Sequence, residues 1–164
     1  MNLRTPRLLI RPVLLEDCEA LFAYRSDTET NQFLSLVPSK VGDIRQFILR
    51  SSPEMNIPNT WFQLAIVLKE SGTLIGDVGI HFLGSISDSE NKQAELGYTL
   101  HKDFRGMGYA TEAISAIIDY LIFDLKKHRI TASIDPSNTN SVRLIERLVF
   151  RKEAHFNQSL LFHG

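Results

Sequence analysis

The segment 105–111, Arg-Gly-Met-Gly-Tyr-Ala-Thr, has the composition and the position of a backbone site for a phosphate anion. It follows a run that predicts a strand, and it opens the longest helical pattern of the chain. N–H groups at a helix start have no intrahelical acceptor, and the helix dipole favours an anion there. Gly106 and Gly108 would let that anion approach the backbone closely. Several charge-assisted hydrogen bonds, worth about 1.5–3 kcal/mol each, could then hold a pyrophosphate.

The same segment has simpler explanations. Two glycines before a helix could be only a flexible entry to it, and Arg105 could either contact the anion or stay solvated. Other phosphate-binding loops fit less well. A dinucleotide-binding loop requires glycine or alanine where this chain has Thr111, and no Gly-Lys-Ser/Thr run is present for a nucleoside triphosphate. A nucleotide-binding protein is therefore the least favoured alternative.

The elements around this segment predict a mixed α+β fold. We expect strands over 8–10, 61–68, 74–83, 94–100, 129–134 and 150–156. We expect helices beginning at 16–17, near 44–48, over 109–126 and over 141–148. Residues 69–73 have turn chemistry and predict a hairpin. Because hairpins come first and strands alternate with helices afterwards, the sheet should be mixed and mostly antiparallel rather than doubly wound.

Apolar spacing predicts which helix faces are buried. The first helix should bury Ala20, Leu21 and Tyr24 on one side. The longest helix has a broad apolar face, which we assign to the core rather than to a membrane surface: Ala110, Ala113, Ile114, Ile117, Ile118, Leu121 and Ile122. Within the strand over 94–100, Gly97 is expected to mark a bulge or a close approach by a ligand.

Composition limits the class of protein. The 164 residues fit one domain over 1–164, with 43% hydrophobic and 23% charged residues. A formal charge of −1 gives no basic surface for nucleic acid. Cys18 is the only cysteine, which favours a reducing compartment. The chain has neither an apolar run of about 18 residues nor a secretory signal, so we expect a soluble cytoplasmic protein with no membrane partner.

A metal site is not expected either. The five histidines have no paired ligand spacing, and each is interpreted as exposed or satisfied by its neighbours: His81, His101, His128, His155 and His163. No Gly-x-Ser-x-Gly elbow is present, which leaves a serine hydrolase unsupported.

With these residues in place, the chain resembles the GNAT superfamily of N-acetyltransferases. Arg105-x-x-Gly108-x-Ala110 is similar to the family's acetyl-CoA signature, Arg/Gln-x-x-Gly-x-Gly/Ala. The stretch 135–148 looks like the Asn-x-x-Ser helix entry of the Rim branch, which includes ribosomal-protein-alanine acetyltransferases and acetylates N-terminal and other amines. The opening 5–12, the run 74–76 and the run 95–98 also follow the family's order. The resemblance extends over nearly the whole chain.

The resemblance implies a GNAT fold, with acetyl-CoA in a splayed V between central strands. It implies transfer of an acetyl group to a primary amine, on a peptide N-terminus or a small molecule, by direct attack on the thioester. Backbone groups of one strand would pair with the pantetheine arm, those of the loop would bind the pyrophosphate, and the last helix would add further contacts. The implied cofactor-binding residues are Tyr98, Thr99, Leu100, Arg105, Gly106, Met107, Gly108, Tyr109, Ala110, Thr111, Asn138, Ser141 and Arg143.

The same resemblance implies a general base, because an alkyl ammonium with a pKa of about 10 must lose a proton before it attacks. Glu95 is the candidate, and a positioned carboxylate contributes about 10²–10⁴-fold. A bulge at Gly97 would point a backbone N–H at the thioester oxygen and stabilise the developing charge. Alternatively, Glu95 only anchors the substrate or pairs across the sheet.

Ser141 is the candidate acid for the departing thiolate, and Asn138 is suited to bind the cofactor or the substrate amide. Both could instead be ordinary helix caps, worth about 1 kcal/mol. Many relatives have a tyrosine on this helix as the acid, whereas this chain has Ile145 after Leu144. That difference favours Ser141 for the role.

Two features depart from the family. Relatives usually end the last helix with Leu-Gly-Phe, whereas this chain has Val149 in the middle position, which costs about 1–2 kcal/mol if the left-handed turn is kept. Relatives also continue into a final strand, and from the resemblance we expect this strand to be missing here. An open apolar edge around 156 and 160–162 then predicts a homodimer, local disorder or lowered stability. A catalytically impaired acetyl-CoA-binding or sensing domain, or a truncated enzyme, is the alternative. The acceptor is left open, because the segments 28–59 and 84–91 that would select it have no readable motif.

Overall fold

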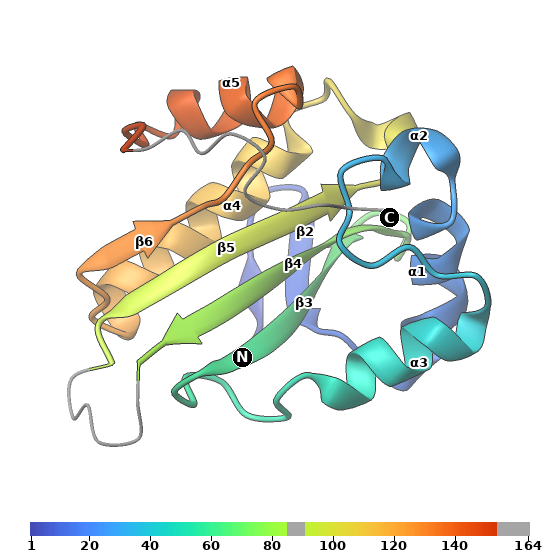
Figure 1. The fold of residues 1–164 in the computed structure, drawn as a ribbon, viewed down its shortest axis with the longest axis horizontal. Coiled ribbons are helices and arrows are strands. Elements are labelled where there is room, and N and C mark those ends of the chain that lie inside the picture. Colours follow the sequence, from blue (N-terminus) through green and yellow to red (C-terminus); the bar gives the residue numbers. More distant parts are fainter. Residues whose placement is uncertain (85–90, 154–164) are drawn as a thin grey trace.

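A six-stranded sheet in the order β1-β2-β3-β4-β5-β6 forms the centre of the computed structural model, which describes residues 1–84 and 91–153 (Figure 1). Neighbouring strands are antiparallel from β1 to β5, whereas β5 and β6 are parallel. The strands are β1 (Leu3–Arg4), β2 (Leu8–Pro12), β3 (Thr60–Leu68), β4 (Leu74–Leu83), β5 (Gln93–Leu100) and β6 (Arg129–Thr131). The predicted mixed, mostly antiparallel sheet is therefore confirmed.

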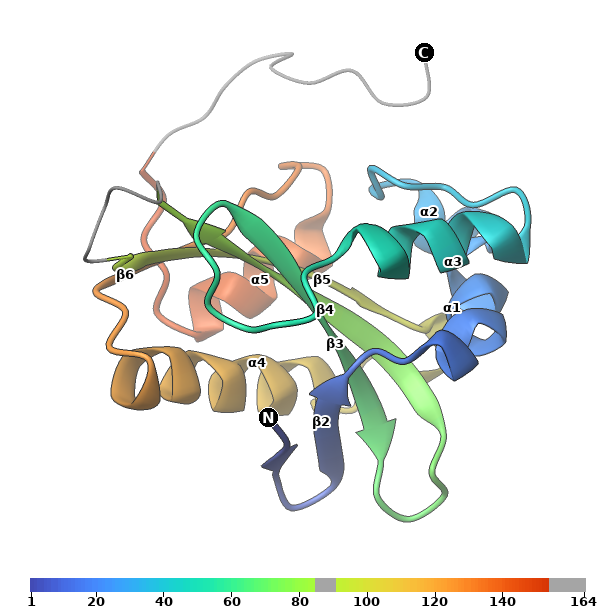
Figure 2. The same cartoon turned by 90° about the horizontal axis from the view of Figure 1, so that it is seen from below.

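Helices cover both faces of this sheet, with α4 on one side and α1 and α3 on the other (Figure 2). The α-helices are α1 (Cys18–Arg25), α2 (Thr28–Asn31), α3 (Val41–Arg50), α4 (Tyr109–Asp119) and α5 (Thr139–Arg147). Short 3-10 turns η1 (Leu15–Asp17) and η2 (Lys102–Phe104) precede α1 and α4, and a π-helical turn, η3 (Tyr120–Asp124), extends α4. Across residues 1–84 and 91–153, no helix combines the length and apolarity that crossing a membrane requires.

The main core lies between the sheet and α4, because alternate residues of each strand point to the same face. On β5 these are Ala94 and Leu96, both buried. The other buried members of this core are Leu8, Ile10, Phe62, Leu64, Ile66, Ile75, Val78, Ile80, Phe82, Leu100, Ala113, Ile114, Ile117, Leu121, Leu144 and Ile145. A second, smaller cluster joins α1 to α3 on the other side and comprises Cys18, Leu21, Tyr24 and Ile44.

Helix α1 differs from its predicted face. Leu21 and Tyr24 are buried as expected, but Ala20 is exposed. The buried stripe instead includes Cys18, Leu21 and Arg25, which follow the helical spacing i, i+3, i+7. Arg25 can occupy this stripe because its guanidinium pairs with a carboxylate on β4, which a purely apolar pattern does not reveal.

The end of the long helix also differs. Ile122 is 40% exposed, although α-helical spacing assigned it to the core. The reason is the π-turn η3, which adds a residue to the turn and so rotates the side chains that follow. Leu121 stays buried, whereas Ala110 and Ile118 are half-buried.

Two predicted strands are shorter than expected or missing. The strand predicted over 129–134 is confined to β6, because within 1–84 and 91–153 its pairing is limited to Gln93, Ala94 and Glu95. Residues 150–153 form no strand, and the rest of that predicted strand, 154–156, lies outside the described residues. Arg129 Nη1 donates to Glu153 Oε1 at 3.0 Å and so holds this segment to β6 by side chains. The apolar edge predicted at 156 and 160–162 also lies outside the described residues, so the homodimer stays a prediction.

Strands β5 and β6 part after a short paired stretch, and this separation positions the candidate site. Pairing ends at Glu95, opposite Thr131, whereas β5 continues to Leu100. From Leu96 onward the outer edge of β5 therefore has no partner strand among the described residues. Figure 1 shows the chain after β6 turning away towards α5.

Candidate active site

The segment between η2 and α4 has the geometry of a backbone anion site. Gly106 and Gly108 adopt left-handed φ values of 74° and 80°, which glycine tolerates without strain. No side chain in the described part of the chain caps α4. The first N–H with a helical acceptor is that of Glu112, which donates to the Gly108 carbonyl at 3.0 Å. The N–H groups of Tyr109, Ala110 and Thr111 are thus left free for a ligand.

The Arg105 side chain turns away from this loop. Its Nε donates to the Leu100 carbonyl at 3.2 Å, and its Nη2 donates to Thr30 Oγ1 at 3.2 Å. Its Nη1 also lies 3.5 Å from a carboxylate oxygen of Glu29. Arg105 therefore links the end of β5 to α2. In this structure its side chain is neither directed at the anion site nor simply solvated, the two roles that the sequence left open.

The bulge expected at Gly97 is absent, so that part of the prediction is wrong, whereas a close approach by a ligand stays a prediction. The β4–β5 register is continuous, with Gly79 directly opposite Gly97, and the shift in register lies instead between Ile66 and Val67 of β3. Because the two glycines pair one to one, no extra residue has to be accommodated. A Cβ added at Gly97 would meet no atom within 4 Å, so this point of the sheet surface is open.

The alternation of backbone groups decides which residues of β5 face the opening. The His101 N–H donates to the Ile75 carbonyl at 2.8 Å, so the odd-numbered residues of β5, including Gly97 and Thr99, direct their backbone groups to β4. Those of Tyr98 and Leu100 point the other way, to the unpaired edge. The structure therefore brings Tyr98 and Leu100 to the opening but not Thr99, and the Leu100 carbonyl already accepts from Arg105.

The start of α5 lies against the same stretch of β5. The Tyr98 hydroxyl donates to the Ser141 carbonyl at 3.4 Å, and burial raises the pKa of Tyr98. Asn138 is the N-cap of α5, since its Oδ1 accepts from the Ser141 N–H at 3.3 Å. The capping interpretation of Asn138 is thus present in the structure. The Ser141 hydroxyl has no hydrogen-bond partner in the described part of the chain, and Arg143 is exposed on the same helix.

Glu95 lies where β5 and β6 part, on the face opposite the α4 core. Ser133 Oγ donates to Glu95 Oε1 at 2.8 Å, which orients the carboxylate. His81 Nδ1 lies 3.8 Å from the other carboxylate oxygen, and the Glu95 side chain stays 25% exposed. An oriented carboxylate that is accessible to solvent and lies beside the open surface at Gly97 has the geometry required of a proton acceptor.

The sequence did not reveal that Ser133 and His81 lie beside Glu95, or that Trp61 stacks on His81. Sheet pairing places Trp61 opposite His81 and His81 opposite Glu95, so the three side chains share one face. The Trp61 and His81 rings are stacked with centroids 4.7 Å apart, and Trp61 is 41% exposed. The hairpin turn 69–73 alone would not reveal this group. The register set by Val67 and Leu74 shifts by one residue at Ile66, and only this shift places Trp61 opposite His81.

No group of three or more His, Cys, Asp or Glu side chains that could hold a metal ion occurs within 1–84 and 91–153. The prediction that the protein needs no metal is not tested by this finding.

Comparison with known proteins identifies the class. Residues 7–151 match the acetyltransferase (GNAT) domain. The chain is 34% identical over 153 residues to an uncharacterized N-acetyltransferase, p20, of Bacillus licheniformis, covering 93% of this chain and 83% of that protein. It is 38% identical over 69 residues to the ribosomal protein uS5-alanine N-acetyltransferase of Escherichia coli, covering 42% of this chain and 36% of that protein. A crystal structure of a GNAT-family acetyltransferase from Bacillus anthracis superposes with a TM-score of 0.84 at 27% identity, covering 98% and 89% of the two chains.

A mixed sheet with an unpaired central edge beside an uncapped helix start is thus the scaffold of an N-acetyltransferase. The chain belongs to the GNAT family of acetyltransferases, and its relatives include enzymes of the Rim type.

Proposed function

We propose that the protein transfers an acetyl group from acetyl-CoA to a primary amine by direct attack of the amine on the thioester. The supporting observation is the course of β5, which runs from Glu95 past an unpaired backbone edge to the uncapped start of α4. GNAT acetyltransferases use acetyl-CoA, and each part of that molecule has a counterpart along this path.

The pyrophosphate would bind the free N–H groups of residues 106–111, where helix dipole and backbone donors both favour an anion. The pantetheine arm would lie along the outer edge of β5, pairing with the Tyr98 carbonyl and the Leu100 N–H. The distance fits this arrangement, because the five-residue step from Glu95 to Leu100 spans about 16 Å of extended strand, close to the length of an extended pantetheine arm. Asn138, Ser141 and Arg143 approach from the start of α5.

In the reaction we propose, Glu95 accepts a proton from the substrate ammonium, directly or through a water molecule. The amine nitrogen then forms a bond to the acetyl carbon, the carbon–sulfur bond breaks, and the nitrogen loses its second proton to solvent as the amide forms. Glu95 also returns its proton to solvent. The Tyr98 N–H, which faces the opening, stabilises the negative charge on the oxygen, a role that we earlier expected from a bulge at Gly97. The Ser141 hydroxyl gives a proton to the departing thiolate and recovers it from solvent.

The acceptor amine belongs either to a peptide N-terminus or to a small molecule. The peptide N-terminus gains support from the uS5-alanine N-acetyltransferase relative. We also propose a cytoplasmic location, supported by a single cysteine that is free and buried.

A direct test measures the thiol released from acetyl-CoA by the purified protein in the presence of amine acceptors. The panel should contain short peptides with free N-termini, a polyamine, an amino acid and an aminoglycoside. We expect thiol release that depends on at least one acceptor class and yields one acetylated amine per thiol. Thermal unfolding of the protein with each cofactor gives a second measurement. A higher melting temperature with NAD or ATP, but not with acetyl-CoA, would contradict the proposal.

A second candidate is an acetyl-CoA-binding sensor without catalysis. The observation that favours it is Val149, which has a left-handed φ of 65° directly after the helix that contains Ser141. Strain at Val149 affects the end of α5 more than its start, where Ser141 lies. Because the proposed catalytic serine is at the less affected end, we prefer the enzyme. Thermal stabilisation by acetyl-CoA with no thiol release for any acceptor would favour the sensor.

A further inference from the structure

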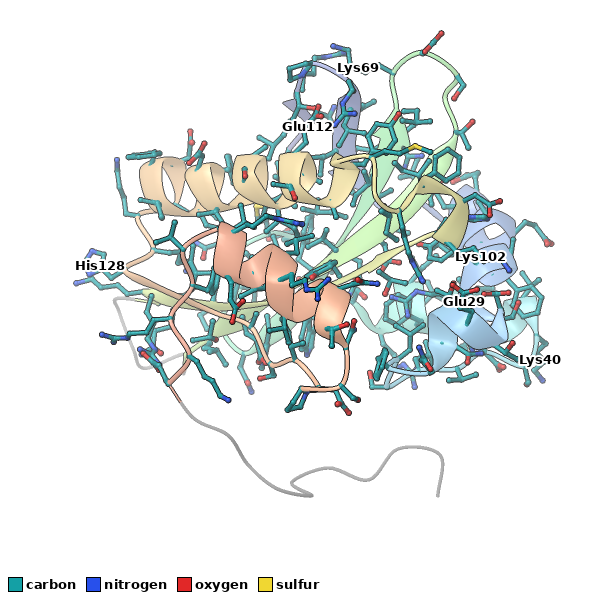
Figure 3. All side chains as sticks on the ribbon, turned by 90° about the horizontal axis from the view of Figure 1, so that it is seen from above. Glu29, Lys40, Lys69, Lys102, Glu112 and His128 are labelled. Atoms are coloured by element: carbon teal, nitrogen blue, oxygen red, sulfur yellow. The ribbon has the colours of Figure 1, made fainter. Side chains whose placement is uncertain are left out.

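The β1–β2 hairpin at the N-terminus contacts the first turn of α4 through a single carboxylate. Thr5 Oγ1 donates to Glu112 Oε1 at 2.5 Å, and the Arg7 N–H donates to the same oxygen at 2.9 Å. Arg7 Nε donates to Glu112 Oε2 at 2.6 Å. Figure 3 shows Glu112 at the junction of α4 with this hairpin, and Lys69 beside it. Lys69 Nζ donates to the Thr5 carbonyl at 2.9 Å, and this bond holds the turn between β1 and β2 in place.

Arg7 also reaches the loop before α4. Its Nη1 donates to the Met107 carbonyl at 2.8 Å, and its guanidinium lies 4.3 Å from the centre of the Tyr109 ring. A Cβ added at Gly108 would come within 3.3 Å of Arg7 Nη2. The Arg7 side chain thus contacts Met107 and Tyr109 and lies next to Gly108 in the segment proposed to bind the pyrophosphate.

The hydrogen bond to Met107 has a geometric consequence for its neighbour. In a trans peptide the carbonyl of one residue and the N–H of the next point in opposite directions. By holding the Met107 carbonyl, Arg7 directs the Gly108 N–H to the other side of the loop. The left-handed conformations of Gly106 and Gly108 allow the turn to adopt this orientation.

Glu112 would otherwise be a poor neighbour for an anion. Burial raises the pKa of its carboxyl, but the hydrogen bonds from Thr5 and Arg7 lower that pKa by more, so the group stays ionised. Its negative charge is paired with Arg7 on the hairpin side of the helix. The ion pair therefore removes a repulsive charge from the loop and also anchors Arg7.

We propose that Arg7 is a positioning residue for the pyrophosphate loop, which rests on the proposed use of acetyl-CoA. Arg7 acts through Met107 and Glu112 to hold the loop N–H groups towards the anion, and it does not contact the reacting atoms. It should therefore affect donors that have a pyrophosphate and leave shorter donors unaffected.

The test compares two donors, acetyl-CoA and S-acetylpantetheine, which lacks the pyrophosphate and the nucleotide. For Arg7→Ala we expect the KM for acetyl-CoA to rise by about tenfold to hundredfold, the loss of one charge-assisted hydrogen bond. Its kcat, and both constants for S-acetylpantetheine, should stay within about twofold of the wild type. Arg4→Ala is the matched control, since Arg4 is exposed on the same hairpin and loses the same charge.

Arg7→Lys separates geometry from charge and serves if Arg7→Ala does not fold. Lysine keeps the charge but cannot bind Met107 and Glu112 with a planar fork, so the KM for acetyl-CoA should still rise. A wild-type KM for Arg7→Lys, or equal losses with both donors, would overturn the positioning role. Calorimetry with CoA distinguishes the two ways in which the proposal can fail. If the wild type does not bind CoA, both the proposed function and this inference are wrong. If the wild type and Arg7→Ala bind CoA with equal affinity, only this inference is wrong.

Discussion

Glu95 is the side chain on which the proposed chemistry depends most. Glu95→Gln keeps the size of the side chain and can still interact with Ser133, but it cannot accept a proton. We expect kcat to fall by about 10²–10⁴-fold, while affinity for CoA is unchanged. Steady-state kinetics and calorimetry measure the two quantities, with Glu70→Gln in the exposed hairpin turn as the control. A variant that keeps wild-type kcat would show that Glu95 is only an anchor.

Asp17 gives a prediction for the pH dependence of stability. Burial raises the pKa of its carboxyl, but hydrogen bonds from Arg11 and from the Leu14 N–H lower it by more, to below its ordinary value of 3.8. A carboxyl whose pKa is lower in the folded state stabilises the fold above its unfolded value, and this stabilisation is lost as pH falls through the folded value.

The free energy of unfolding should therefore decrease on acidification below the ordinary pKa of Asp17, and Asp17→Asn should show a smaller decrease over that window. Urea unfolding between about pH 6 and pH 2 measures the difference. Identical acid dependence in the two proteins would contradict the assignment.

At the scale of elements, Val149 shows how one residue can strain the end of a helix. The side chain is 90% exposed and makes no compensating core contact, while the backbone keeps the left-handed turn that glycine favours. Val149→Gly should raise the free energy of unfolding by about 1 kcal/mol, after allowing for the greater freedom of glycine in the unfolded chain.

Thermal or urea unfolding measures this change. Val37→Gly is the matched control, because Val37 is also exposed but has no left-handed φ. It should show no gain. If both variants lose stability equally, the turn at Val149 is not strained.

The elements were largely predictable because most of them are long and strongly patterned. The hairpin turn at 69–73 and the alternation of β3 and β4 follow from local chemistry, as does the start of α4 at Gly108. Ile122 was wrongly assigned to the core because a π-turn changes the helical period there. The apolar spacing of the sequence does not predict this π-turn.

The candidate site was predictable in part. The loop 105–111 and Glu95 were predicted from residue types and a family resemblance. The structure places Glu95, Tyr98 and the loop on one strand and its continuation, while their roles stay predictions. The partners of Arg105 and Arg7 were not found, because they lie about 75 to 105 residues away in the sequence. Such contacts depend on how the layers pack, which local patterns do not encode.

At the scale of the whole molecule, a buried ion pair joins the helical layer to the sheet. Arg25 Nη2 on α1 lies 2.5 Å from Asp77 Oδ2 on β4, and the two side chains are 8% and 1% exposed. The Tyr24 hydroxyl also donates to Asp77 at 2.5 Å. Removing one partner leaves an uncompensated buried charge, whereas removing both does not.

Asp77→Ala should therefore lower the free energy of unfolding by about 3–5 kcal/mol. The double variant Arg25→Leu, Asp77→Ala should recover part of this loss. Urea unfolding of both single variants and the double variant gives the coupling energy. Additive losses would mean that the two charges do not stabilise the packing of α1 on the sheet together.

The central claim, that CoA binds along β5 and the start of α4, is tested most directly by recording backbone amide NMR shifts during a CoA titration of this 18.6 kDa protein. We predict the largest shifts at Gly106, Gly108 and Ala110, with a second group at Tyr98 and Leu100. Pantetheine should move only the second group. Saturating CoA that shifts neither group, or shifts only residues elsewhere, would contradict this claim.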